Sequence, residues 1–148
     1  MTKNELGQHY FKQGYNCAQA VVLSFVEELQ IDKQTALSMI AGFGAGMGRL
    51  RDVCGAVSGM IAVLGAKFGS FDPCDSGAKA KLYQQVQLAV QKFRQINGSS
   101  VCRELLSLKE QISSPTPEER TQDYYKKRPC AQLVGCACEI VEEILKQD

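Results

Sequence analysis

Several features that would assign a functional class are missing from this sequence. It has no C-x-x-C pair, which argues against a thioredoxin-type dithiol and a zinc ribbon, and the absence of C-x-x-C-H excludes covalent haem attachment. Positive charge is not in excess, because the formal net charge is +1 and the basic residues are scattered among acidic ones. We therefore expect no nucleic-acid binding. The lone histidine, His9, is expected on the surface of the first helix.

Long apolar runs are missing as well. The longest run, near residues 55–68, is interrupted by glycine and is too short to span a bilayer, so we expect no membrane insertion. The first residues, Met1 to Glu5, are polar and are not followed by an apolar run of the signal-peptide type. These absences predict a cytoplasmic protein.

What the sequence does have is helical periodicity in nearly every segment. Apolar residues recur at the spacing of one buried helix face, and no alternating strand pattern is present. We predict an all-α fold with one cysteine-rich domain over residues 1–148, built as a compact bundle of about six to seven helices. The helices are expected in a first segment ended by Gly14, at 17–29, behind Asp32, at 55–68, at 76 to about 96, around Cys102, from Pro117 through Tyr125, and from Pro129 onward.

The helix predicted at 55–68 is apolar almost all round, which favours a central position. Small residues such as Gly55, Gly59 and Ala62 recur along one of its sides and would let another helix approach closely. The polar stretch 109–122, which contains Pro115 and Pro117, is expected to be one long surface connection.

Cysteine is unusually frequent for a cytosolic chain. There are seven, an odd number that cannot all pair: Cys17, Cys54, Cys74, Cys102, Cys130, Cys136 and Cys138. Because cytosolic thiols are kept reduced, such cysteines more often bind metal or carry out redox chemistry than cross-link a fold. Cysteine also serves as a small buried hydrophobe, which is the alternative at each position.

Four of these residues, Cys17, Cys54, Cys102 and Cys130, fall in the first turn of a predicted helix. A helix N-terminus offers unpaired N–H groups and partial positive charge, which favour the thiolate. Since the thiolate is the nucleophile and the metal ligand, these four are the candidate catalytic residues. Cys54 is the first choice of nucleophile, because the glycine-containing helix start behind it supplies N–H donors and access, and one of the other three would resolve the intermediate.

The remaining cysteines carry weaker signals. Cys74 follows Asp72-Pro73 and is a fifth candidate for a helix start. Cys136 and Cys138 lie two residues apart inside the last helix and therefore face different sides. We interpret them as packing residues, one buried and one near the surface.

A glycine-rich stretch spans residues 42–48. It is not a dinucleotide-binding loop, because a helix precedes it and the spacing G-x-G-x-x-G is not met. We expect a sharp turn in which backbone packs against backbone. A second interpretation is a nest of N–H groups that, with Arg49 and Arg51, holds an anion or a thiolate.

Five ordered blocks of the sequence resemble one family. They are Gly14-Tyr-Asn-Cys17-Ala-Gln-Ala, Gly42-Phe-Gly-Ala-Gly-Met-Gly48, Cys54-Gly-Ala-Val-Ser-Gly59, Cys102-Arg-Glu-Leu-Leu106 and Pro129-Cys130. Together they resemble the redox-active proteins named for the motif C_GCAxxG_C_C. The resemblance implies that Cys17, Cys54, Cys102 and Cys130 are the characteristic cysteines and that the function is redox chemistry of unassigned substrate. The family is distantly similar to split-Soret cytochromes, whose haem-binding motif is missing here.

Three functions remain open at this point. The leading one is a thiol-based redox protein that exchanges disulfides with an unknown redox partner or small molecule. The second is a metal protein in which Cys17, Cys54, Cys102 and Cys130 hold zinc or an iron–sulfur cluster, for which the usual compact spacings are absent. The third is a helical interaction module without catalysis, in which the cysteines pack and the small-residue side of helix 55–68 forms tight contacts or a homodimer interface.

Overall fold

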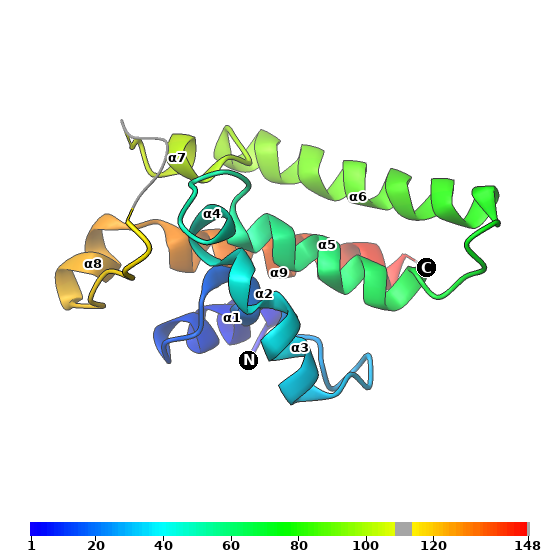
Figure 1. Cartoon of the computed structure of the whole chain (residues 1–148), viewed down its shortest axis with the longest axis horizontal. Coiled ribbons are helices and arrows are strands. Elements are labelled where there is room, and N and C mark those ends of the chain that lie inside the picture. Colours follow the sequence, from blue (N-terminus) through cyan, green and yellow to red (C-terminus); the bar gives the residue numbers. More distant parts are fainter. Residues whose placement is uncertain (109–113, 148) are drawn as a thin grey trace.

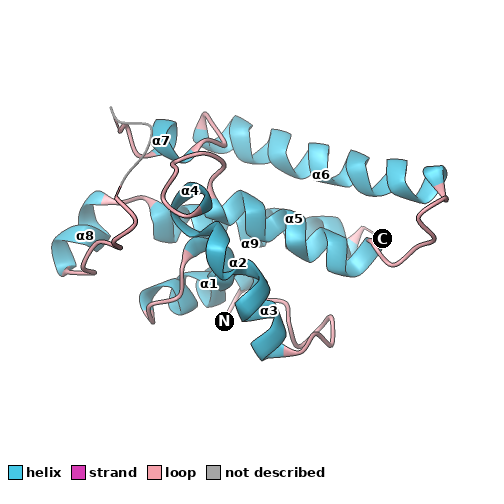
Figure 2. Cartoon of the chain, in the orientation of Figure 1, coloured by secondary structure: helices cyan, strands magenta, loops and turns pink. Residues whose placement is uncertain are grey.

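The computed structural model describes residues 1–108 and 114–147, and the segments with helical periodicity form helices there. In order, the elements are α1 (Lys3–Lys12), α2 (Cys17–Leu23), α3 (Lys33–Ile40), the 3₁₀ turn η1 (Ala41–Phe43), α4 (Gly44–Met47), α5 (Gly55–Phe68), α6 (Ser76–Asn97), α7 (Cys102–Leu105), α8 (Gln122–Lys127) and α9 (Cys130–Lys146). No strand occurs among these described residues, and the only bridge there joins Val53 to Val101 (Figure 2). The all-α prediction is confirmed.

Helices α5 and α9 form the centre of the arrangement. Helix α1 packs mainly on α9, α2 on α5, and α6 runs beside α5 along one edge (Figure 1). The interior is filled by large apolar side chains, among which Phe11, Phe25, Met60 and Phe93 are at most 1% exposed. At Gly59 a Cβ would lie 2.7 Å from the Cβ of Val21, so the predicted close approach of a helix to α5 is that of α2.

The helix ends follow local capping signals in most places. Asp32 caps α3 through the N–H of Thr35, and α5 has the predicted bounds. Helix α6 is followed by its C-cap residue Gly98, which has a left-handed φ of 89°. The last helix begins at Cys130, one residue after the predicted start at Pro129, which is its N-cap residue. None of the helices in the described part of the chain combines the length and apolarity needed to cross a bilayer.

Helix α2 is shorter than predicted. It ends at Leu23 instead of residue 29, although Phe25 and Val26 remain buried. The hydroxyl of Ser24 donates to the carbonyl of Ala20 at 2.9 Å, and the N–H of Phe25 bonds to Val22 three residues back. Such side-chain bonding and the tighter 3₁₀-type pattern compete with the α-helical ladder.

Two other predictions also differ from the structure, and a third lies partly outside the described residues. Helix α8 begins at Gln122 with Thr121 as its cap, not at Pro117, because Thr121 accepts a hydrogen bond from the N–H of Tyr124. Cys74 lies in an exposed turn before α6, which Asp75 caps, so it is not a helix-start cysteine. Of the predicted surface connection 109–122, residues 109–113 lie outside the described residues.

Candidate active site

The four helix-start cysteines line a single cavity of about 260 Å³. Cys17, Cys102 and Cys130 are the first residues of α2, α7 and α9, and Cys54 is the residue that precedes α5. Their predicted placement at helix starts is therefore confirmed, and the structure also brings them together, which the sequence had left open. None of the four is more than 8% exposed.

Cys54 and Cys102 are held near each other by a short antiparallel pairing of two segments. The N–H of Cys54 donates to the carbonyl of Ser100 at 2.9 Å, and the N–H of Cys102 donates to the carbonyl of Asp52 at 2.6 Å. A third bond joins the N–H of Arg103 to the carbonyl of Arg51 at 3.1 Å. This ladder fixes the two cysteines although they are far apart in the sequence.

Cys17 is positioned by the cap of its helix. Asn16 accepts a hydrogen bond from the N–H of Gln19 at 2.9 Å, while the Gln19 side chain accepts one from the N–H of Asn16 at 3.2 Å. The Asn16 amide also donates to the carbonyl of Ala41 at 2.9 Å and so ties the start of α2 to the residue that precedes the glycine-rich stretch. At Gly55 a Cβ would lie 3.0 Å from the Cβ of Cys17, which is why α5 can begin so close to α2.

The glycine-rich stretch makes a left-handed turn over the cavity. Ala45, Gly46, Met47, Gly48 and Arg49 all have φ between 55° and 72°, and the N–H of Gly48 bonds to the carbonyl of Gly44 at 2.9 Å. Left-handed angles cost roughly 1–2 kcal/mol at a residue that carries a Cβ. Such strain persists where neighbouring contacts hold it in place, and it clusters at functional sites.

Two contacts show what this turn achieves. A Cβ at Gly46 would lie 2.5 Å from the Cβ of Cys102, so only glycine lets the turn pack onto that cysteine. Arg51 follows with φ of 61° and is only 4% exposed. Its Nη1 donates to the sulfur of Cys102 at 3.7 Å. Of the predicted nest that would hold an anion or a thiolate, the structure shows one part, the contact of Arg51 with the sulfur of Cys102.

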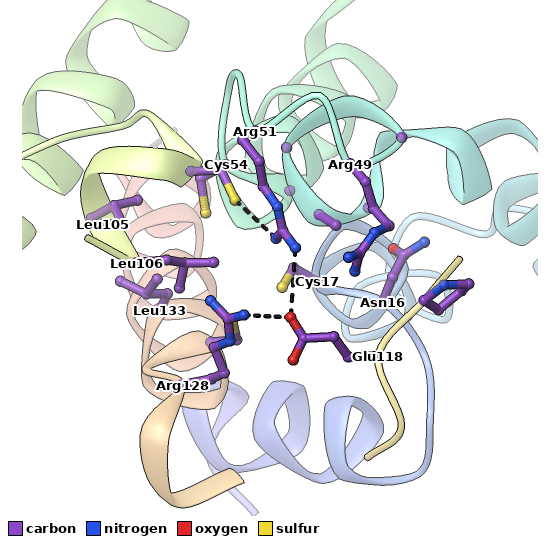
Figure 3. A pocket seen from close by; sticks show the side chains of 18 of the residues that line it. Asn16, Cys17, Arg49, Arg51, Cys54, Leu105, Leu106, Glu118, Arg128 and Leu133 are labelled. Carbon is purple, nitrogen blue, oxygen red and sulfur yellow. Dashed lines mark hydrogen bonds and ion pairs between the residues drawn. The ribbon is translucent and has the colours of Figure 1, made fainter. Parts of the chain in front are cut away.

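Charged side chains from the opposite side complete the cavity. Arg128, two residues before Cys130, is paired with the carboxylate of Glu118, and Arg51 reaches the same carboxylate at 3.8 Å (Figure 3). Arg49 lies beside them and donates through Nε to the carbonyl of Ser114 at 2.6 Å.

Arg120 also lines the cavity but is fixed by its own contacts. Its guanidinium lies 4.1 Å from the ring centroid of Phe11 and donates to the carbonyls of Phe11 and Tyr15. Arg120, Arg128 and Glu118 were missed in the sequence because they come from a polar connection and a short helix. The adjacency of Arg128, Pro129 and Cys130 was the one local signal available for them.

The protonation states of Cys17 and Cys130 are opposed. The hydrogen bond from the Cys17 thiol is the largest cause that lowers the pKa of Cys130 to about 7, and the charges of Arg128, Arg120 and Arg51 act in the same direction against burial. The same hydrogen bond, followed by burial, raises the pKa of Cys17 well above its ordinary value. The pair therefore loses its first proton near neutral pH, and the directions of the two shifts favour the thiolate at Cys130 and the thiol at Cys17.

The other two cysteines of the cavity are protonated thiols at neutral pH. Burial raises the pKa of Cys54 to about 12, although the backbone N–H groups of Ala56 and Val57 act to lower it. The N–H donors expected for Cys54 are thus present, but desolvation outweighs them. Burial also raises the pKa of Cys102 despite the hydrogen bond and charge of Arg51.

Cys136 and Cys138 lie away from this cavity, in the middle of α9. Cys138 is fully buried and Cys136 is half-buried, as predicted, and burial raises the pKa of both, that of Cys138 to about 12. Across residues 1–108 and 114–147, no group of three or more His, Cys, Asp or Glu side chains is arranged to hold a metal ion.

Fold and site together define an all-α protein in which four helix-start thiols meet arginines in one cavity. A family model described as "Putative redox-active protein (C_GCAxxG_C_C)" matches residues 15–144, and the chain belongs to that family. The matched range contains all four cysteines of the cavity. No curated protein and no solved structure matched the chain.

Proposed function

We propose that this protein reduces disulfides by thiol–disulfide exchange, with Cys130 as the nucleophile and Cys17 as the resolving thiol. One observation carries the proposal: Cys17 and Cys130 line the same cavity, and the interaction between their two thiols shifts their pKa values in opposite directions. A thiol with pKa near the ambient pH combines thiolate population with nucleophilicity. The family description, which names redox activity, agrees with this chemistry.

The exchange balances as follows. The Cys130 thiolate attacks one sulfur of a disulfide R–S–S–R, a Cys130–S–S–R bond forms, and RS⁻ leaves and takes a proton from water. The Cys17 thiol then loses its proton and attacks the Cys130 sulfur, which releases the second RSH. The protein is left with a Cys17–Cys130 disulfide, two electrons have passed to the substrate, and an external dithiol reductant restores the two thiols.

This assignment replaces Cys54 with Cys130 as the proposed nucleophile. The Cys54 thiol is 4% exposed and has a pKa of about 12, so little thiolate is present at neutral pH. Cys54 and Cys102 remain candidate redox residues, because they line the same cavity and the charge of the Cys130 thiolate acts to raise the pKa of both.

The test is a single-turnover reaction without oxygen. Fully reduced protein is mixed with one equivalent of bis(2-hydroxyethyl) disulfide, released thiol is measured, and the new protein disulfide is mapped by mass spectrometry. We expect loss of two protein thiols and a Cys17–Cys130 bond. Cys17→Ser should instead accumulate a mixed disulfide on Cys130, while the matched control Cys136→Ser should behave like the wild type.

Two results would overturn the proposal. One is a reduced protein that releases no thiol from the disulfide. The other is a Cys17→Ser variant whose mixed disulfide maps to a cysteine other than Cys130. Metal content is measured in the same preparation, because stoichiometric zinc or iron that protects the four cysteines would establish the Cys₄ alternative in place of exchange.

A further inference from the structure

The cavity concentrates positive charge that the chain as a whole does not carry. Arg49, Arg51, Arg120 and Arg128 all line it, and Glu118 is the carboxylate among its described lining residues. The formal net charge of the whole sequence is only +1. Arginine stays charged under all ordinary conditions, so a cavity of this composition attracts an anion.

Two of these arginines converge on one carboxylate. Arg51 and Arg128 both face Glu118, and the side chains of the two arginines are 5% and 18% exposed. The Glu118 side chain is 39% exposed and comes from the connection between α7 and α8 rather than from the bundle. The structure therefore contains a preformed carboxylate position with one buried donor, Arg51, and one partly buried donor, Arg128, whose present occupant is on the surface.

This carboxylate position lies beside the sulfur of Cys102, in the cavity that Cys17 and Cys130 also line. Nη1 of Arg51 is 3.7 Å from the sulfur of Cys102, and the charges of Arg128 and Arg51 both lower the pKa of Cys130. A molecule held by its carboxylate between the two arginines would place neighbouring atoms at the reactive thiols.

The exposure of the thiols limits the size of that molecule. Cys17 and Cys130 are each 8% exposed, and the cavity that leads to them measures about 260 Å³, which is near the lower end for small-molecule sites. A disulfide on the surface of a folded protein would not reach sulfurs this deep, whereas a small disulfide would.

We infer that the substrate is a small disulfide bearing a carboxylate, which Arg51 and Arg128 bind in the position that Glu118 now occupies. The inference rests on the proposed function, since the bond that is reduced is the one attacked by Cys130. Guanidinium groups bind carboxylates through paired, charge-assisted hydrogen bonds, so the planar carboxylate suits this site. Glu118 competes with the substrate for the same donors.

The experiment compares two disulfides of similar size that differ in charge. Single-turnover rate constants are measured for 3,3′-dithiodipropionate, which carries two carboxylates, and for the neutral bis(2-hydroxyethyl) disulfide. Each is divided by its rate constant with a free small thiolate. We expect the wild type to prefer the dicarboxylate by about tenfold or more, the effect of one charge-assisted hydrogen bond.

Substitutions test which residues cause the preference for the dicarboxylate disulfide. Arg128→Gln should reduce the ratio of the two normalised rate constants to a small residual preference. This ratio does not change with the amount of Cys130 thiolate, because both reactions use the same thiolate. Arg103→Gln is the matched control, because Arg103 forms an ion pair with Asp52 at 3.6 Å but does not line the cavity. It should keep the wild-type ratio. Glu118→Gln should raise the ratio severalfold, since a competing carboxylate is removed.

The outcomes separate this inference from the proposed function. Equal normalised rate constants for the two disulfides in the wild type would overturn the carboxylate site and leave disulfide exchange standing. Failure to reduce either disulfide would overturn both. A second measurement needs no variant: the rate of Cys130 alkylation by iodoacetate relative to iodoacetamide should exceed the ratio for a free thiolate, and an equal ratio contradicts the site.

Discussion

Two positions on helix α9 carry cysteines with opposite character. Cys130 in the first turn is 8% exposed and Cys138 in the middle is fully buried, yet their pKa values are about 7 and about 12. Cys130 receives a hydrogen bond from Cys17 and faces three arginine charges. Cys138 is surrounded by packed residues, and burial outweighs the hydrogen bond from Ser24. The comparison shows that partner groups, and not depth alone, decide which thiol ionises.

The largest expected effect is on the reactive end of the helix. Cys130→Ser should lower the rate of thiol alkylation at pH 7 by about fifteenfold or more, because a thiol with pKa 7 is half ionised there and an ordinary thiol with pKa about 8.5 only about 3%. The measurement is labelling by iodoacetamide in a Cys74→Ser background, which removes the exposed thiol. Cys138→Ala should leave the rate unchanged, and equal losses in the two variants would contradict the comparison.

Gly46→Ala tests the left-handed turn that supports the reactive end. The added methyl group would lie 2.5 Å from the Cβ of Cys102 and 2.8 Å from the Cα of Arg51. We expect a loss of about 2–4 kcal/mol in the free energy of unfolding, from overpacking and from a left-handed φ. Denaturant unfolding measures it. Gly65→Ala, with nothing within 4 Å of the new Cβ, is the matched control and should lose no stability.

Cys17→Ala tests the largest cause of the low Cys130 pKa. Without the hydrogen bond from Cys17, the pKa of Cys130 rises, so less thiolate is present at a given pH. The alkylation rate should fall severalfold below pH 7, and the difference from the wild type should shrink as pH rises and Cys130 ionises in both proteins. A pH profile identical to that of the wild type would show that the hydrogen bond does not set the pKa.

The smallest effect concerns the packed middle of the helix. A Cβ at Gly7 would lie 2.6 Å from the sulfur of Cys138, so Gly7→Ala should cost about 1–3 kcal/mol of stability by overpacking. Cys138→Ala removes the sulfur that Gly7→Ala would clash with. The double variant should therefore be at least about 0.5 kcal/mol more stable than the sum of the two single effects predicts. A double-mutant cycle in denaturant measures this coupling, and strict additivity would argue against Cys138 as a packing residue.

Features that depend on neighbouring residues, such as helix starts, could be predicted from the sequence. Asn16, Asp32 and Pro129 marked helix starts correctly, because a cap depends on residues only a few positions away. The placement of Cys17 and Cys130 at such starts followed from these caps. The same reasoning overextended α2 to residue 29, since the apolar spacing continues through Phe25 and Val26 after the helical hydrogen bonds have ended.

The choice among the thiols depended on tertiary structure. Cys54 has the N–H donors that its local sequence predicted, but its burial follows from the segment around Ser100, which is distant in the chain. Arg51 reaches the cavity only through a left-handed turn, and Arg128 and Glu118 approach from the far side. No spacing rule in the sequence encodes these contacts.

The most direct test is the pH dependence of Cys130 alkylation in reduced protein whose exposed Cys74 is replaced by serine. Iodoacetamide labelling is followed over time, and the modified residue is identified by mass spectrometry at each pH. The account predicts that Cys130 is labelled first and that its rate is half-maximal near pH 7. First labelling at another cysteine, or a half-maximal pH of about 8.5 or higher, the range of an ordinary thiol, would contradict it.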